Sequence, residues 1–496
     1  MTLSLDYSDF EQTYLCGETQ LVSKRLVGDL ETPVSAFLKL ADGRKNAFLL
    51  ESVEGGEQLG RFSIIGRDPD LLWRANAGVS SINRNALKSP DGFAAEDGAP
   101  LHNLKRLLDE SRIKLPADLP PMAAGVFGYL GYDMVRQMER LGPRPAGGLD
   151  TPDAVFIRPT LIAVFDNVRQ EISLFTPVRT RQDVCAIDAY AAAQETLDTA
   201  VADLTVGLGA DATHSATLNL TKTPTPHSNT PRADYKKMVE RAKDYIGAGD
   251  IFQVVLSQRF STPFTASPFE LYRSLRRSNP SPFMFFLNFD GFSVVGSSPE
   301  ILVRVRDNEV TIRPIAGTRP RGANAEEDAA LEDDLLNDEK ERAEHLMLLD
   351  LGRNDVGRSA KIGTVRVTES FEIERYSHVM HIVSNVVGRL REDVDPVDAV
   401  AAGFPAGTVS GAPKIRAMEI IDDLEPERRG IYGGAIGYFS ANGNVDTCIA
   451  LRTGVIKDGG LHVQAGAGIV ADSDPAKEHA ECVNKAAALF AAAASV

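Results

Sequence analysis

The sequence is poor in cysteine and tryptophan, with four cysteines and one tryptophan among 496 residues. The cysteines show no CxxC spacing, so neither a disulfide framework nor a cysteine zinc site is indicated; they are Cys16, Cys185, Cys448 and Cys482. No apolar run reaches the roughly 18 residues that cross a bilayer, and the first residues lack the pattern of a secretory signal. We therefore expect a cytoplasmic protein that does not bind membranes.

Basic residues are also in the minority. The chain has 53 lysines and arginines against 69 aspartates and glutamates, which gives a formal net charge of -16. This charge opposes binding to a polyanion, so we expect no nucleic-acid partner. An anionic ligand would need local positive groups inside a pocket, supplied by arginines, backbone N–H groups or a metal ion.

The first part of the chain, residues 1–204, mixes expected strands such as Val155–Phe165 with expected helices such as Ala186–Ala202. Residues 205–232 then lose this periodicity and collect Thr, Ser, Asn, Pro and Gly, the composition of a linker. We place a boundary there and expect a second region over 233–496.

The second region also mixes the two kinds of element. Short apolar runs between Phe285 and Arg313 predict consecutive strands, whereas Leu331–Leu351 and Pro475–Ala494 predict long helices. The chain therefore has an α+β pattern, and it contains no repeat of 20 to 50 residues that would indicate a solenoid or a propeller.

Two glutamate pairs have the spacing of one helical face. Glu341 and Glu344 are three residues apart, and Glu478 and Glu481 repeat this spacing on the last expected helix. Carboxylates gathered from two helices would suit Mg²⁺, which prefers oxygen ligands. The simpler alternative is an exposed charged face. Zinc is disfavoured because neither helix contains HExxH.

Three glycine-rich turns and a histidine pair could complete a site. The turns are PIAGTRPRG at 314–322, PAGTVSGAPK at 405–414 and QAGAG at 464–468, and they could cradle an anion or simply be tight turns. In RYSHVMHIVSNVV, His378 or His381 could be a general base or a buried core histidine.

Taken together, PIAGTRPRG, DEKERAEHLMLLDLGRND, RYSHVMHIVS, PAGTVSGAPKIRAM, YGGAIGYF, DTCIALR and QAGAGIVADSDPAKEHAECVNK resemble the chorismate-utilising enzymes, from Arg313 to Lys485. LLESVEGGEQLGRFSIIG at 49–66, GDIFQVVLSQRF and NPSPFMFFL resemble the large subunits, or component I, of the anthranilate synthases within that family. The resemblance implies packed antiparallel sheets flanked by helices, with a regulatory region over 1–204 and a catalytic chorismate-binding domain over 233–496.

The resemblance also implies roles for individual residues. Glu344 and Glu481 would hold Mg²⁺, with Glu341 and Glu478 beside them. Glu300 would be the acid, His381 the base and Thr408 an orienting hydroxyl, which leaves a structural role for His378. The positions that match chorismate contacts are Gly317, Thr318, Tyr432, Arg452, Gly466, Ala467 and Gly468.

A second ligand site is implied near the amino terminus. The residues that match the family's tryptophan pocket are Glu51, Ser52, Asn279, Pro280, Ser281, Pro282, Phe283 and Met284. Many relatives have tyrosine where this chain has Phe283, so one possible hydrogen bond to the ligand is missing here.

The implied activity is that of a Mg²⁺-dependent lyase that converts chorismate and ammonia to anthranilate and pyruvate in tryptophan biosynthesis, under feedback inhibition by L-tryptophan. The chain has no nucleophile turn for glutamine hydrolysis, so a separate glutamine amidotransferase subunit would supply the ammonia in a hetero-oligomer. The alternatives are aminodeoxychorismate synthase component I and a non-catalytic tryptophan-sensing relative. The first is disfavoured because its PIKGT lysine is replaced here by Ala316.

Overall fold

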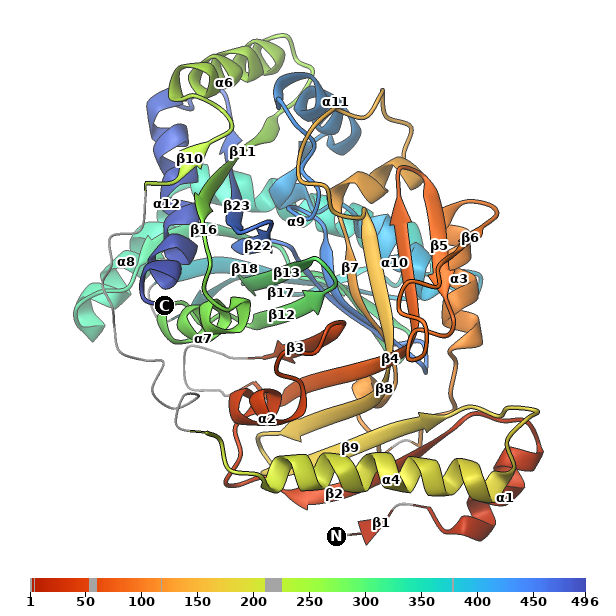
Figure 1. Ribbon diagram of the computed structural model, residues 1–496. Coiled ribbons are helices and arrows are strands. Elements are labelled where there is room, and N and C mark those ends of the chain that lie inside the picture. Colours follow the sequence, from red (N-terminus) through yellow and green to blue (C-terminus); the bar gives the residue numbers. More distant parts are fainter. Residues whose placement is uncertain (1, 4, 53–59, 117, 210–224, 377–378) are drawn as a thin grey trace.

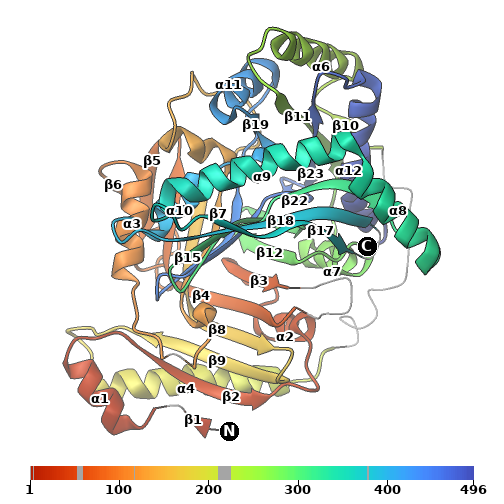
Figure 2. The same cartoon turned by 180° about the vertical axis from the view of Figure 1, so that it is seen from behind.

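A computed structural model describes residues 2–3, 5–52, 60–116, 118–209, 225–376 and 379–496. The paired strands are antiparallel throughout and form one connected hydrogen-bonded network. Helices cover the outer faces of the sheets (Figures 1 and 2). The α+β class with packed antiparallel sheets is therefore confirmed.

The helices are α1 (Tyr7–Leu15), α2 (Pro33–Leu40), α3 (Pro100–Glu110), α4 (Ala186–Thr205), α6 (Arg232–Gly247), α7 (Pro268–Ser278), α8 (Ala325–Asn337), α9 (Glu339–Ser359), α10 (Pro396–Gly403), α11 (Lys414–Leu424) and α12 (Pro475–Ala494), with 3-10 turns η1 (Pro121–Ala123), η2 (Tyr132–Gln137) and η3 (Gly407–Val409). The strands are β1 (Thr2–Leu3), β2 (Gln20–Val27), β3 (Ala47–Glu51), β4 (Phe62–Asn76), β5 (Val79–Asn83), β6 (Ala94–Glu96), β7 (Gly125–Leu130), β8 (Ala154–Asp166), β9 (Glu171–Val178), β10 (His227–Ser228), β11 (Gln253–Pro263), β12 (Phe283–Phe289), β13 (Phe292–Ser298), β14 (Ile301–Arg306), β15 (Glu309–Ile312), β16 (Ile315–Pro320), β17 (Arg366–Arg375), β18 (Val379–Arg389), β19 (Gly411–Ala412), β20 (Ala435–Ser440), β21 (Val445–Ile449), β22 (Thr453–Lys457) and β23 (Gly460–Ile469).

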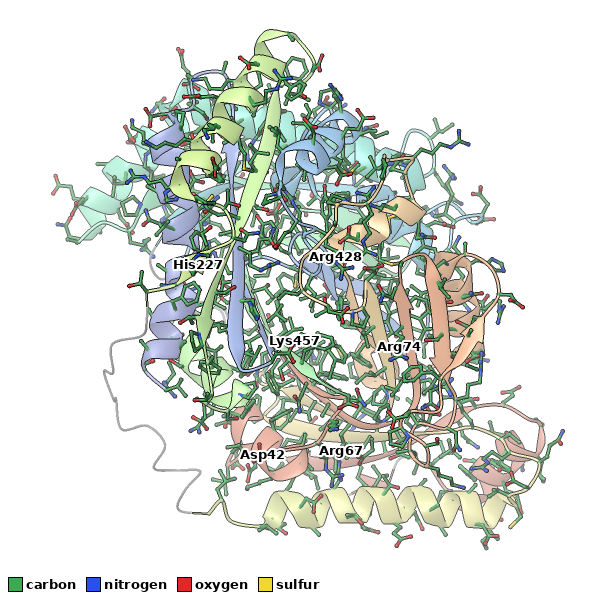
Figure 3. The ribbon with its side chains drawn as sticks, turned by 45° about the horizontal axis from the view of Figure 1, so that its top comes forward. Asp42, Arg67, Arg74, His227, Arg428 and Lys457 are labelled. Atoms are coloured by element: carbon green, nitrogen blue, oxygen red, sulfur yellow. The ribbon has the colours of Figure 1, made fainter. Side chains whose placement is uncertain are left out.

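Alternation along the strands divides the apolar side chains between cores on the two sheet faces. In β12, Met284 and Phe286 pack into a core that includes residues of α2, α4, α7 and α12, whereas Phe285 and Leu287 pack into a core shared by β3, β4, β7, β8 and β20. This is the two-residue period of a strand buried on both faces. Figure 3 shows side chains projecting from the ribbons into the spaces between them.

The sheet crosses the boundary that the sequence predicts between its two regions. β3 pairs with β12, and β7 pairs with β20, so strands from residues 1–204 and 233–496 share ladders as well as cores. Within the expected linker at 205–232, β10 pairs with β11 and residues 210–224 lie outside the described residues. The division into a regulatory and a catalytic region stays a prediction.

The long helix expected at Leu331–Leu351 is two helices, α8 and α9, so that expectation is wrong in its continuity. The break is at Asp338, whose carboxylate accepts hydrogen bonds from the backbone N–H groups of Lys340 and Glu341 at 3.0 and 3.1 Å. An aspartate in this position caps the start of a new helix. The expected helix Pro475–Ala494 is α12, with the same bounds. No helix among the described residues is long and apolar enough to span a membrane.

Candidate active site

A cavity of about 510 Å³ collects almost every residue that the sequence predicts for catalysis, substrate binding and metal binding. We call it the glutamate pocket. Its walls come from β11, β16, β18, β23, α9, α12 and η3. The predicted residues that line it are Glu300, Gly317, Thr318, Glu341, Glu344, His381, Thr408, Tyr432, Arg452, Gly466, Gly468, Glu478 and Glu481.

Ala467 is the one predicted substrate contact whose side chain lies elsewhere. It is fully buried in the core, between Gly466 and Gly468, which both line the pocket. Successive residues of a strand face opposite sides, so only the backbone of Ala467 is left to face a ligand. At its neighbours a methyl group would collide: a Cβ on Gly466 would lie 2.8 Å from the Tyr432 hydroxyl, and one on Gly468 would lie 2.5 Å from Gln253 Nε2.

The four glutamates approach the pocket in two pairs because each pair occupies one face of its helix. Glu341 and Glu344 come from α9, and Glu478 and Glu481 come from α12. Burial raises the pKa of Glu344, and the neighbouring charges of Glu341 and Glu481 raise it further. Burial also raises the pKa of Glu341 and of Glu478. The pocket thus concentrates negative charge that a cation would neutralise.

The donor chemistry fits Mg²⁺, although the carboxylates do not form a closed cage. Within the described residues, no three His, Cys, Asp or Glu side chains are close enough together to hold a metal ion as a group. Glu481 is instead paired with Lys485 at 2.7 Å, and Glu341 lies 3.5 Å from Arg319. Mg²⁺ needs only one or two carboxylates and keeps several waters, so an open set of oxygens is compatible with it. The metal assignment stays a prediction.

The imidazole of His381, on β18, is held in place by contacts from β16. A β-bulge in β16 makes these contacts possible. The register between β16 and β18 shifts at Gly317, whose φ of 67° favours glycine. The Gly317 carbonyl lies 2.9 Å from His381 Nδ1, and Thr318 Oγ1 lies 3.0 Å from the same nitrogen. With the proton on Nδ1 donated to this carbonyl, Nε2 is left as the acceptor. Burial lowers the pKa of His381 to about 4, so the ring is neutral near pH 7.

Glu300, in contrast to His381, can donate a proton at neutral pH. It follows β13, is almost fully buried, and both of its carboxylate oxygens lie near the Thr408 hydroxyl, at 3.2 and 3.1 Å. Burial raises its pKa to about 8, and hydrogen bonds from Thr408 and from the backbone of Ile315 only partly oppose this shift. Glu300 therefore carries its proton at neutral pH and can donate it, while neutral His381 can accept one.

Arg452 supplies the positive charge that the net charge of the chain does not. It forms no salt bridge within the described part of the chain, and burial lowers its pKa. Arg452 lies in the turn after β21 and has a φ of 46°. A planar guanidinium without a carboxylate partner suits bidentate binding of a ligand carboxylate.

Sequence reasoning missed several residues of the pocket wall, including Gln253, Lys340, Gln464 and Lys485. Gln253 donates to Glu344 Oε1 at 3.3 Å, and its own Oε1 is buried without a partner. Lys485 also reaches the Gly466 carbonyl at 3.1 Å. A helical signal could have found Lys485, since it lies one turn after Glu481 on α12.

The family of chorismate binding enzymes matches residues 46–491 of this sequence. Anthranilate synthase component 1 of Cereibacter sphaeroides is 58% identical over 487 residues, which cover 98% of this chain and 97% of that protein. This chain belongs to the chorismate binding enzymes. Anthranilate synthase component I from Streptococcus pneumoniae has a similar structure, with a TM-score of 0.76 and 37% identity over 94% of this chain and 98% of that one. The menaquinone-specific isochorismate synthase of Escherichia coli shares the fold at 20% identity and a TM-score of 0.71, over 96% and 95% of the two chains.

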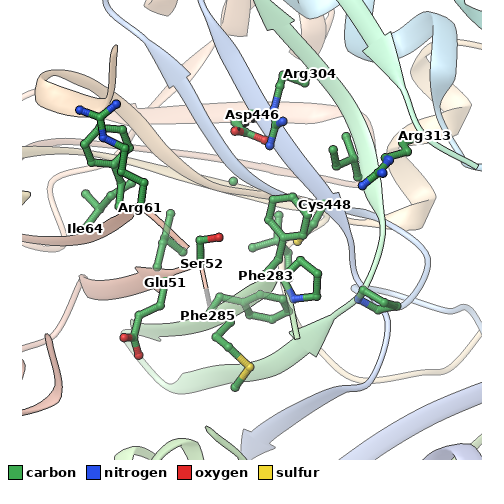
Figure 4. Close-up of a pocket in the computed structure, with 18 of the residues that line it drawn as sticks. Glu51, Ser52, Arg61, Ile64, Phe283, Phe285, Arg304, Arg313, Asp446 and Cys448 are labelled. Carbon is green, nitrogen blue, oxygen red and sulfur yellow. Dashed lines mark hydrogen bonds and ion pairs between the residues drawn. The ribbon is translucent and has the colours of Figure 1, made fainter. Parts of the chain in front are cut away.

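This chorismate binding enzyme has a second large cavity, of about 610 Å³, which we call the arginine pocket. Its wall includes five arginines: Arg61, Arg304, Arg306, Arg313 and Arg375. Five residues of the predicted tryptophan site also line it, namely Glu51, Ser52, Pro282, Phe283 and Met284. Residues of β3 and β12 meet there because these strands pair, with Glu51 opposite Met284 (Figure 4).

The predicted tryptophan site is only partly gathered at this pocket. Asn279, Pro280 and Ser281 do not line it, and Asn279 instead ends α7. The Glu51 carboxylate is turned away from Cys448 and Asp446 in Figure 4 and accepts two hydrogen bonds from Arg276, at 2.7 and 3.0 Å. Glu51 therefore links β3 to α7, while Ser52 and Phe283 remain on the pocket side.

Proposed function

We propose that this chain is the chorismate-using component of an anthranilate synthase, a lyase that converts chorismate and ammonia to anthranilate and pyruvate. The observation that carries the proposal is the pairing, in one pocket, of a protonated Glu300 with a neutral His381. One group is ready to give a proton and the other to take one, as an amination followed by an elimination requires. The 58% identity to a component 1 protein agrees with this chemistry.

In the first step, ammonia attacks ring carbon C2 while the 4-hydroxyl leaves as water, with its extra proton coming from Glu300. Both ring double bonds shift, from C1–C2 to C1–C6 and from C5–C6 to C4–C5, and the ammonium nitrogen formed at C2 releases a proton. Thr408 orients the Glu300 carboxyl through its hydroxyl. Arg452 has the geometry to bind the enolpyruvyl carboxylate, which fixes the ring against Gly317 and Gly466.

In the second step, His381 Nε2 removes the proton from C2. The electron pair aromatises the ring, the bond between C3 and the ether oxygen breaks, and the leaving enolpyruvate takes up a proton to become pyruvate. The Gly317 carbonyl fixes the tautomer of His381 in which Nε2 is the base. An anionic substrate near the ring would raise the pKa of His381 from about 4 and make it a stronger base.

We further propose that Mg²⁺ binds between the glutamate pairs, with Glu344 and Glu481 as ligands and Glu341 and Glu478 beside them. When bound, the ion would neutralise the ring carboxylate of chorismate beside the four glutamates, of which only Glu481 is paired with a pocket lysine, Lys485. The partner-free oxygen of Gln253, next to Glu344, supports a polar ligand there.

Ala316 favours amination over the alternatives. It lines the glutamate pocket on β16, opposite Ile382, and its methyl group leaves room for free ammonia. In the lysine-bearing relatives that aminate at C4 or add water, a long amine would occupy this space. The non-catalytic alternative is disfavoured by the intact set of Glu300, His381 and Arg452.

The proposed enzyme also has a regulatory site and a partner subunit. The arginine pocket would bind L-tryptophan against Ser52 and Phe283, within a regulatory region over 1–204 that precedes the catalytic region over 233–496. A glutamine amidotransferase subunit would deliver ammonia, since the relatives are named component 1.

The purified chain is therefore expected to form anthranilate from chorismate, Mg²⁺ and an ammonium salt, and to leave glutamine untouched. The reason is the absence from the sequence of a nucleophile turn that could hydrolyse an amide. Anthranilate fluorescence is the measurement, with a glutaminase subunit added as the positive control for glutamine. Rapid glutamine-dependent turnover by the single chain would contradict the proposal.

The protonation of Glu300 predicts the pH dependence. Its raised pKa means that the proton it donates is present below about pH 8 and is lost above it. Expressed per free ammonia, the rate of the wild type should fall above about pH 8, whereas total ammonium hides this because raised pH supplies more ammonia. Glu300→Gln should lower the rate about 10²- to 10⁴-fold, and its rate per free ammonia should not show the fall above about pH 8. A rate per free ammonia that stays level well above pH 8 would remove Glu300 from the acid role.

A further inference from the structure

The glutamate pocket and the arginine pocket share a wall. Pro299 and Ile315 line both cavities, on the chain segments that enter β14 and β16. Glu300, the residue after Pro299, faces only the glutamate pocket, and Arg313, two residues before Ile315, faces only the arginine pocket. A ligand in the arginine pocket is therefore close to Glu300 of the glutamate pocket, and a ligand in the glutamate pocket is close to Arg313 of the arginine pocket.

Two hydrogen bonds and one ring contact link Arg313, in the arginine pocket, to His381, in the glutamate pocket. Arg313 Nη1 donates to Glu374 Oε1 at 2.9 Å, and the Tyr376 hydroxyl donates to Glu374 Oε2 at 2.7 Å. Arg313, Glu374 and Tyr376 all line the arginine pocket. The rings of Tyr376 and His381, the latter in the glutamate pocket, make a T-shaped contact with centroids 5.5 Å apart and planes at 64°. The hydrogen bond to Glu374 and the edge-to-face contact with His381 together restrict the Tyr376 side chain.

The backbone N–H and carbonyl of Tyr376 itself are both hydrogen-bonded, which leaves its side chain as the part that can respond. Its N–H donates to the Val379 carbonyl at 2.8 Å, and its carbonyl accepts from Arg321 Nη1 at 2.7 Å. Glu374 pairs directly with His381 across β17 and β18. Residues opposite each other in an antiparallel pair point to the same face, so the position of Glu374 is tied to that of His381.

We propose that Tyr376 is a positioning residue for His381 and that Arg313, Glu374 and Tyr376 transmit ligand occupancy of the arginine pocket to the catalytic base. The proposal rests on the proposed function, in which that pocket binds L-tryptophan. The carboxylate of an amino acid would compete with Glu374 for Arg313. The Glu374 carboxylate would then move, and the Tyr376 hydroxyl that donates to it would move as well. The Tyr376 ring, which contacts His381, would shift with its hydroxyl.

The coupling between tryptophan binding and chorismate binding can be measured without turnover, because each ligand must change the affinity of the other by the same factor. If tryptophan disfavours the arrangement that binds chorismate, chorismate must weaken tryptophan binding by the same factor, typically about 5- to 150-fold. In the absence of ammonia the two ligands can be titrated together, because amination cannot start. Tyr376→Phe keeps the ring against His381 and removes only the hydroxyl that reaches Glu374. Tyr376→Leu removes the ring as well.

The experiment compares wild type, Tyr376→Phe and Tyr376→Leu by calorimetric titration of L-tryptophan with and without chorismate, and by kcat and KM for ammonium-dependent turnover. In Tyr376→Phe we expect that chorismate no longer changes the tryptophan affinity. Tyr376→Leu should lower kcat about tenfold or more at little changed KM for chorismate, because the base is misplaced and the substrate contacts are not. Tyr7→Phe is the matched control: it removes a tyrosine–glutamate hydrogen bond of 2.8 Å, to Glu11, away from both pockets.

Each outcome is decisive. Loss of coupling in Tyr376→Phe, with coupling kept in Tyr7→Phe, supports the relay. Coupling of wild-type size in Tyr376→Phe overturns the relay and leaves the proposed function intact. Tyr376→Leu with wild-type kcat overturns the positioning role. Failure of wild-type protein to bind tryptophan, while it still makes anthranilate, overturns the regulatory part of the proposed function together with the relay.

Discussion

Glu344→Ala is expected to reduce anthranilate formation by at least about 100-fold while the chain stays folded. The change removes a proposed Mg²⁺ ligand that faces the ring carboxylate of the substrate, and the negative charge left on that side of the pocket then repels the substrate. Folding should be little affected, because burial and the neighbouring glutamates raise the pKa of Glu344 in the folded protein. A carboxylate with a raised pKa is less stable when ionised in the folded state than in water, so above its ordinary pKa its removal takes away no net stabilisation.

The measurement has three parts: anthranilate fluorescence, Mn²⁺ binding by electron paramagnetic resonance as a probe for the metal, and thermal unfolding. Glu339→Ala is the matched control, since Glu339 is an exposed residue at the start of the same helix and does not line the pocket. Glu481→Ala should behave as Glu344→Ala does. Near wild-type turnover and unchanged Mn²⁺ binding in both variants would show that the metal is not held by these helices.

His381→Ala should uncouple the two halves of the reaction. The variant is expected to consume chorismate and ammonia and to accumulate an aminated compound that still carries the enolpyruvyl group, since only the elimination needs the base. Anthranilate formation should fall about 10²- to 10⁴-fold, the usual contribution of a general base. The cavity left behind borders Thr318 and Tyr376, whose own backbone contacts do not depend on the imidazole.

Mass spectrometry of the reaction mixture distinguishes the intermediate from chorismate and anthranilate. His462→Ala is the control, because His462 is a half-buried histidine that lies outside the glutamate pocket, with its Nδ1 2.9 Å from Ser261 Oγ. If chorismate is not consumed and no intermediate forms, His381 binds substrate and is not the base of the second step alone.

Much of the local structure could be predicted from the sequence. The bounds of α12 match the predicted range, and the expected strand at Val155–Phe165 is β8, one residue longer at each end. The residues of the candidate active site were also predictable from their motifs, and all of them but Ala467 line the glutamate pocket. These features depend on periodicity and on short, distinctive turns, which are encoded by residues near one another in the chain.

The sequence by itself determined the α+β class, the two glutamate pairs and the family, because each rests on local spacing or on the order of motifs. The tertiary structure alone decided how these parts meet. Only folding turns the Gly317 carbonyl toward His381, buries Glu300 so that its pKa rises to about 8, and turns the Glu51 carboxylate toward Arg276. Only folding places Tyr376 between the two pockets. The reason is physical: burial, hydrogen-bond partners and pKa shifts depend on residues far apart in the chain, whose contacts are set by packing and strand register rather than by local pattern.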